Sequence, residues 1–153
     1  NPCGVATGDD QAQILQYAMD ADPVSFFGGI VVFNRPLEKA AAEKLAPHFF
    51  ELIIAPEFAE GSFEILAAKK NLRLITVDFA RLEAAKTKDL RSVPGAGGYL
   101  LQDQDLPLWN ESDIKLVSKA PADAQTMKDL AFASRVAKFV KSNSVVFASG
   151  GRS

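Results

Sequence analysis

The sequence has few of the side chains that most often bind metals or form covalent bonds. Among 153 residues it has one cysteine, Cys3, and one histidine, His48. Zinc sites use clusters of such side chains, so we expect no metal. A lone cysteine cannot form a disulfide within the chain, which favours the reducing cytoplasm. Cys3 would act as a nucleophile only with a base beside it, and a structural or solvated role is the simpler interpretation of His48.

The sequence also lacks a strong charge imbalance and long apolar runs. Its formal net charge is −2 and no stripe of lysines and arginines is present, which argues against a nucleic-acid partner. No apolar run approaches the about 20 residues of a membrane-spanning helix, so we expect no membrane partner. No G-x-G-x-x-G motif follows the first expected strand, which argues against a doubly wound oxidoreductase. The composition, 48% hydrophobic and 24% charged residues, is that of a globular domain.

Hydrophobic periodicity predicts helices and strands in alternation. The helices are expected from Asp9 or Asp10 to before Pro23, over 36–46, over 58–68, and from 121 or 123 to 141–143. The strands are expected over 30–33, 51–56, 71–77, near 98–102 as a strand or hairpin, 115–118 and 144–148, with a loop over 106–113. This order predicts a single layered α/β domain with a mostly parallel or mixed sheet and helices on both faces.

The stretch from Asp22 to Pro36 is the most informative part of the chain. Its apolar run over 30–33 is typical of a strand that is covered on both faces. Gly28 and Gly29 precede the run, where the absence of a Cβ allows positive φ and close approach of a ligand. An accessible N–H beside Phe26 or Phe27 would suit a flat polar heterocycle. The alternative is a glycine bulge with both phenylalanines in the core.

Two polar residues stand at the ends of expected elements. Glu51 opens the strand over 51–56, and a carboxylate there can accept hydrogen bonds from sugar hydroxyls. Asn143 follows the longest expected helix, and its carboxamide can both donate and accept. Taken singly, each residue also fits a structural role, Glu51 as a solvated strand start and Asn143 as a helix C-cap.

Six stretches, in order, resemble the formyltransferase domain of the bifunctional enzyme of purine biosynthesis, in which AICAR transformylase is joined to IMP cyclohydrolase. The resemblance covers essentially the whole chain. The stretches are N-P-C-G-V-A (1–6), D-P-V-S-F-F-G-G-I-V-V-F-N-R (22–35), E-L-I-I-A-P (51–56), K-K-N-L-R-L (69–74), L-R-S-V-P-G-A-G-G-Y-L-L-Q-D-Q-D (90–105) and V-A-K-F-V-K-S-N-S-V-V (136–146).

The resemblance implies an activity, a fold and partners. The activity is transfer of a formyl group from 10-formyltetrahydrofolate to the 5-amino group of AICAR, after which the cyclohydrolase closes the ring to IMP. The fold implied is cytidine-deaminase-like, with two such units in one transformylase domain and a homodimer whose sites lie at the subunit interface. Pro2-Cys3 is similar to part of a deaminase zinc motif, but the second cysteine is missing, so no zinc is expected.

The resemblance also implies roles for four residues. Gly28 would offer its backbone to the nucleotide and Phe27 would lie alongside the heterocycle. Glu51 matches an acidic residue that contacts the nucleotide in the family, and Asn143 would hold the substrate carboxamide. The family's Lys-His pair, which supplies proton transfer, would stand directly before Asn1, so no catalytic residue is assigned within residues 1–153.

Two interpretations of the function remain open after the resemblance is taken into account. The chain opens without a methionine and ends in a loop-like segment, so we expect it to be the first half of a transformylase domain. The alternative is a non-catalytic α/β domain that binds a nucleotide or serves as a scaffold. That alternative predicts covered strand edges and no large apolar face.

We therefore predict that the purified 153-residue chain does not transfer formyl groups. The expected reason is that the residues implied for proton transfer and for much of the folate site lie outside it. The measurement is formation of FAICAR from AICAR and 10-formyltetrahydrofolate. FAICAR formed in proportion to the concentration of the chain would contradict the prediction.

Overall fold

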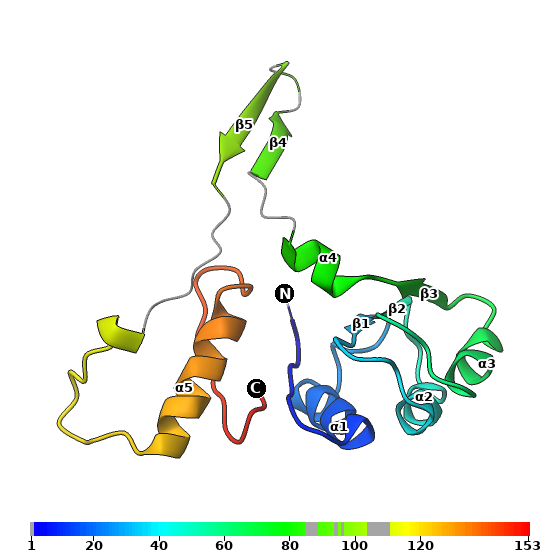
Figure 1. Ribbon diagram of the computed structural model, residues 1–153, viewed down its shortest axis with the longest axis horizontal. Coiled ribbons are helices and arrows are strands. Elements are labelled where there is room, and N and C mark those ends of the chain that lie inside the picture. The colour runs from blue at the N-terminus through cyan, green and yellow to red at the C-terminus, as the bar shows by residue number, and fades with distance from the viewer. Residues whose placement is uncertain (1, 85–88, 94, 96, 104–110) are drawn as a thin grey trace. The chain divides into compact units, whose positions relative to one another are not determined.

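The computed structural model describes residues 2–84, 89–93, 95, 97–103 and 111–153. The chain divides into two compact units, one made of the residues up to Val77 together with Leu116–Ser153, the other of Asp78–Lys115. Figure 1 shows the elements of both units along the chain. None of the described helices is long and apolar enough to cross a membrane.

The first unit contains a parallel sheet of three strands in the order β1-β2-β3. Ile30 pairs with Leu52, and Leu52 pairs with Arg73, so the three strands begin at the same edge. The strands and the helices that alternate with them are α1 (Gln11–Ala21), β1 (Ile30–Val32), α2 (Lys39–Leu45), β2 (Leu52–Ala55), α3 (Ser62–Ala67) and β3 (Arg73–Thr76), and α5 (Ala124–Ala137) follows later in the chain.

Helices α1, α2 and α3 lie on one face of this sheet (Figure 1). Ile53 and Ala55 of β2 are completely buried against them. The helices contribute apolar side chains at helical spacing, which are Leu15, Met19, Ala41, Ala42, Leu45 and Leu66. Removing this apolar surface from water stabilises the unit by about 25 cal/mol per Å².

Polar side chains fix where the helices start. The Asp10 side chain accepts a hydrogen bond of 3.0 Å from the Gln13 N–H and caps α1, and Asp123 caps α5 in the same way through Thr126. Gln11 is buried and joins the start of α1 to the segment before α2, since its Nε2 donates to the Pro36 carbonyl at 2.7 Å. Each cap is one of the two starts that the sequence left open for its helix, Asp10 rather than Asp9 and Asp123 rather than Pro121.

The opposite face of the sheet carries exposed apolar side chains. Ile30 is 62% exposed, Val32 57% and Ile75 45%, whereas Val31 between the first two packs against the core. The prediction of an α/β fold with a parallel sheet flanked by helices is confirmed. The prediction that the strand over 30–33 is covered on both faces is wrong for the part of the chain that the structure describes.

The second unit is built around an antiparallel hairpin. Strand β4 (Asp89–Val93) pairs with β5 (Gly98–Gln102), with Arg91 opposite Leu100, which confirms the hairpin expected near 98–102. The unit also contains α4 (Phe79–Ala84) and the 3-10 helix η1 (Glu111–Asp113). Most of the loop expected over 106–113 falls on residues 106–110, which lie outside the described part.

Two predicted strands are wrong. Residues 115–118 and 144–148 form no strand, and their apolar side chains Val117, Val145 and Phe147 are exposed. A run of β-branched residues becomes a strand only when a neighbouring strand accepts its backbone hydrogen bonds. In place of a final strand, the chain ends in an isolated bridge between Ala6 and Arg152.

Three helices are shorter than predicted. Pro36 lies before α2, not inside it, because Leu37 forms a parallel bridge with Phe58. The same bridge delays α3, which begins only after Gly61 in the left-handed conformation at φ 77°. Helix α5 ends at Ala137, before the Lys141–Asn143 segment where its end was expected.

We predict that Ile53→Ala lowers the free energy of unfolding by about 2–5 kcal/mol, because it opens a cavity beneath the helices. Ile30→Ala, in the neighbouring strand but largely exposed, is the matched control and is expected to cost about 1 kcal/mol or less. Urea unfolding followed by circular dichroism measures both. Equal losses in the two variants would mean that the core does not lie on the helix side of the sheet.

Candidate binding site at the amino ends of the strands

A row of backbone hydrogen bonds crosses the edge at which the three strands begin. The Gly28 N–H donates to the Phe49 carbonyl at 2.9 Å. The Glu51 N–H donates to the Gly29 carbonyl, and the Arg73 N–H donates to the Glu51 carbonyl, each at 3.1 Å. This row brings residues that are far apart in the sequence into adjacent positions, and it places Phe27 and Gly28 beside Glu51.

The two glycines are required by the backbone. Gly28 has a φ of +69°, which side chains rarely allow, and a Cβ on Gly29 would lie 2.9 Å from the Phe26 carbonyl oxygen. The N–H groups of both glycines donate within the chain, Gly29 to Phe26 at 3.0 Å. The expectation of an accessible N–H at this position is therefore wrong.

The phenylalanines divide between the core and the surface. Phe26 packs against the core, with its ring edge-on to His48 at 5.3 Å and stacked on Phe50 at 5.8 Å between centroids. Phe27 is 70% exposed, and its ring lies 5.2 Å from that of Phe49. Each of the two sequence interpretations thus holds for one residue, since Phe26 is structural and Phe27 presents an open aromatic face.

Glu51 forms an ion pair that the sequence analysis did not anticipate. Its Oε2 accepts a hydrogen bond of 2.6 Å from Nη1 of Arg73. Both side chains are exposed to solvent, so the carboxylate is reachable from outside. The sequence alone gives no signal for this pair, because it follows from the register of β2 and β3, in which Arg73 lies one position beyond Glu51 across the sheet.

Lys69 holds the segment that leads to this edge. Its ammonium donates to the carbonyls of Ala46 and His48. These contacts fix the turn between α2 and β2, and they account for the half-buried position of the Lys69 side chain. His48 accordingly has a structural role, with its carbonyl bound by Lys69 and its ring on Phe26.

Asp22 orders the turn before the glycines. Its carboxylate accepts hydrogen bonds from the N–H groups of Ser25 at 2.9 Å and Val24 at 3.2 Å. Hydrogen bonds from the side chain and the backbone of Ser25 hold the pKa of this carboxyl below its ordinary value of 3.8. The turn that presents Phe27 and Gly28 is therefore formed around an ionised aspartate.

The remaining candidates have no recorded contact with this edge in the described part of the chain. Asn143 is exposed in the segment after α5, and within the described residues no recorded hydrogen bond or ring contact joins it to Phe27, Gly28 or Glu51. Cys3 is an exposed free thiol. In the described ranges there is no group of three or more His, Cys, Asp or Glu side chains that could hold a metal ion.

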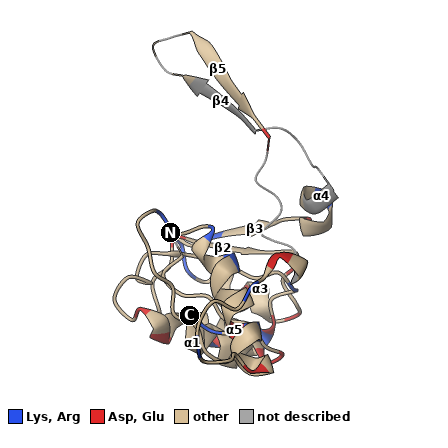
Figure 2. Ribbon diagram, turned by 90° about the vertical axis from the view of Figure 1, so that its left-hand side faces the viewer, with Lys and Arg blue, Asp and Glu red and all other residues tan. Residues whose placement is uncertain are grey.

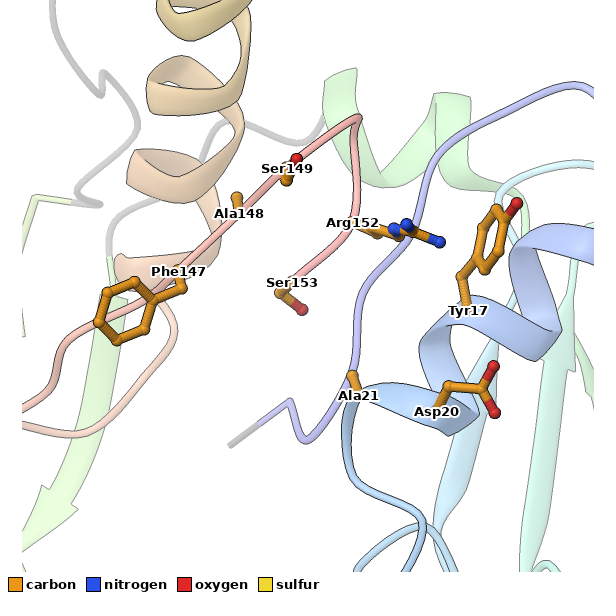
Figure 3. Close-up of a pocket in the computed structure, with 8 residues that line it drawn as sticks. All are labelled: Tyr17, Asp20, Ala21, Phe147, Ala148, Ser149, Arg152 and Ser153. Atoms are coloured by element: carbon orange, nitrogen blue, oxygen red, sulfur yellow. The ribbon is translucent and has the colours of Figure 1, made fainter.

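A pocket of about 400 Å³ occurs elsewhere in the first unit, between α1 and the last residues. In Figure 3 the Arg152 side chain points toward Tyr17, and its guanidinium lies 4.3 Å from the centre of that ring. The lining of this pocket includes Phe147 and Asp20 but none of the four candidate site residues.

Along the described elements, charged residues of both signs are interspersed (Figure 2).

The fold and this edge define a class: an α/β protein whose parallel sheet carries an open aromatic ring and an exposed carboxylate at the start of its strands. Comparison with known proteins gives the family. The model of the "AICARFT/IMPCHase bienzyme" family matches residues 1–153. The chain belongs to this family.

Individual relatives agree with the family assignment. The chain is 47% identical over 148 residues to the "Bifunctional purine biosynthesis protein PurH" of Bacillus thuringiensis, a match that covers 97% of this chain and 28% of that protein. It is 44% identical over 146 residues to the protein of the same name from Pediococcus pentosaceus, covering 95% of this chain and again 28% of the relative. The chain thus spans little more than a quarter of the length of these relatives.

We predict a pH dependence for the turn at Asp22. Because the folded pKa lies below the ordinary value of 3.8, the stabilisation is complete above that value and is lost as the pH falls through the folded pKa. An NMR titration should show the Ser25 amide resonance moving with a midpoint below 3.8.

Asp22→Asn is the control for that titration, since its side chain still accepts the hydrogen bonds but does not titrate. Its Ser25 resonance should lack the acid step. A midpoint at or above 3.8 in the unmodified chain would show that the hydrogen bonds to Asp22 do not persist in solution.

Proposed function

We propose that this chain carries part of the nucleotide site of an AICAR formyltransferase, an enzyme that transfers a formyl group from 10-formyltetrahydrofolate to AICAR and yields FAICAR. In the parent bifunctional enzyme, cyclisation to IMP follows. One observation carries the proposal beyond family membership. The backbone hydrogen bond from the Glu51 N–H to the Gly29 carbonyl brings Glu51 next to the segment that contains Phe27 and Gly28, although the two segments are more than twenty residues apart in the chain.

Each residue has a role that suits its surroundings. The exposed ring of Phe27 lies alongside the imidazole, and the Gly28 carbonyl accepts a hydrogen bond from the nucleotide. The Glu51 carboxylate accepts hydrogen bonds from sugar hydroxyls. Asn143 is assigned to the carboxamide of AICAR by the family resemblance alone, because no contact in the described residues joins it to the strand edge. The 5-amine next to that carboxamide is a weak nucleophile because it is conjugated with the ring. Holding that amine in line with the formyl carbon is the main contribution of such a site.

The proposal extends to the architecture of the parent enzyme. We propose that residues 1–153 form the first of two cytidine-deaminase-like halves of a transformylase domain, that the enzyme is a cytoplasmic homodimer, and that 10-formyltetrahydrofolate is its co-substrate. Neither nucleic acid nor a membrane is a proposed partner. The exposed apolar side chains of Ile30, Val32 and Ile75 support this architecture, because an apolar sheet face of this kind is usually covered by another part of a protein.

The same face weighs against the alternative function. A self-contained, non-catalytic domain that binds a nucleotide or serves as a scaffold is expected to cover its sheet, and this sheet has an apolar face open to solvent. We keep the prediction that the chain alone does not transfer formyl groups, so its nucleotide site is tested by binding.

We predict that the chain binds AICAR ribonucleotide and that Glu51→Gln weakens this binding about tenfold. A hydrogen bond to a charged group contributes about 1 kcal/mol more than one to a neutral group, and glutamine keeps the shape while it removes the charge. Isothermal titration calorimetry measures both dissociation constants.

Glu64→Gln is the matched control for this experiment, since Glu64 is an exposed glutamate on α3 and belongs to none of the contacts at the strand edge. Its affinity should equal that of the unmodified chain. The proposed site is wrong if Glu51→Gln and Glu64→Gln bind equally well, or if the unmodified chain does not bind the nucleotide.

A further inference from the structure

Arg73 is joined to Glu51 twice. The Arg73 N–H donates to the Glu51 carbonyl at 3.1 Å, and Nη1 of its guanidinium donates to Oε2 of the Glu51 side chain at 2.6 Å. The backbone bond fixes the distance between the two Cα positions, so the side-chain bond selects one orientation of the carboxylate. A side chain that is free to rotate would otherwise sample several rotamers at an exposed site.

The ion pair uses one oxygen of the carboxylate. The contact runs through Oε2, so the second oxygen, Oε1, is the one that can accept hydrogen bonds from a ligand. The guanidinium also compensates the negative charge of Glu51. An uncompensated carboxylate would repel the phosphate of a nucleotide, so the pair removes an electrostatic penalty from the site.

We propose that Arg73 is a positioning residue, which holds the Glu51 carboxylate so that its second oxygen accepts hydrogen bonds from the sugar hydroxyls of a bound ribonucleotide. This inference rests on the proposed function. Beyond that function, we infer that this edge of the sheet distinguishes nucleotides that have sugar hydroxyls from nucleotides that lack them. Arg73 is the residue on which this distinction depends.

A purely structural ion pair predicts something different. Exposed ion pairs contribute little to stability. If this pair only stabilised the fold, its loss would weaken the binding of both ligands by the same factor and would leave the preference between them unchanged. The preference for one ligand over another is therefore the quantity that separates a positioning role from a structural one.

The experiment compares Arg73→Met and Arg73→Lys with the unmodified chain. Methionine keeps an unbranched apolar stem without charge, whereas lysine keeps the charge but not the planar fork of the guanidinium. Lys39→Met is the matched control, because Lys39 also forms an exposed ion pair, at 3.8 Å with Glu43 within α2. Calorimetry gives dissociation constants for AICAR ribonucleotide and for its 2′,3′-dideoxy analogue, and thermal unfolding verifies that each variant is folded.

We expect the unmodified chain and Lys39→Met to bind the ribonucleotide about tenfold or more tightly than the dideoxy analogue, as the loss of hydrogen bonds to a charged group implies. Arg73→Met should reduce this ratio to about threefold or less, and Arg73→Lys should give an intermediate ratio. An Arg73→Met variant that keeps the full ratio overturns the inference and leaves the proposed function intact. An unmodified chain that binds neither nucleotide overturns both.

Discussion

The backbone hydrogen bonds across the amino ends of β1, β2 and β3 are the constraint on which the candidate site depends. They run from Gly28 to Phe49, from Glu51 to Gly29 and from Arg73 to Glu51. The bonds of Glu51 and Arg73 belong to the parallel pairing of the sheet or extend it by one residue, and the bond of Gly28 lies two residues before the start of β1. The core beneath the sheet therefore also determines the geometry of the site, since a shift in register would separate the aromatic ring, the carboxylate and the guanidinium together.

This location is unusual for an α/β sheet. Ligands of open α/β sheets most often bind at the carboxyl ends of the strands, where the connecting loops lead into helix N-termini. The groups at the amino ends of β1 to β3 are different: the Phe27 ring, the backbone of Gly28 and the Glu51 carboxylate, which is paired with Arg73. Under the proposed function, these groups suit the sugar and the heterocycle of a nucleotide better than its phosphate, which would need donors from another part of the protein.

Local signals in the sequence predicted much of this fold, and contacts between distant residues explain the errors. The aspartate caps, the three parallel strands and the hairpin were predictable, because each depends on capping chemistry or on a short apolar pattern. The strands expected over 115–118 and 144–148 are absent, since an apolar run does not reveal whether a pairing partner exists. Within the site, Glu51 was a candidate from its position alone, but its partner Arg73 follows only from the register of β2 and β3.

The contacts of Lys69 limit how the chain can change length. Lys69 binds the carbonyls of Ala46 and His48, and a few residues later Arg73 binds Glu51, so both ends of the connection between α3 and β3 are attached to the same short segment. Inserting or deleting a residue in this connection would break one attachment or shift β3 by one position, which turns each of its side chains to the other face. Surface loops commonly tolerate insertions and deletions, but this one should keep a constant number of residues wherever the site is kept.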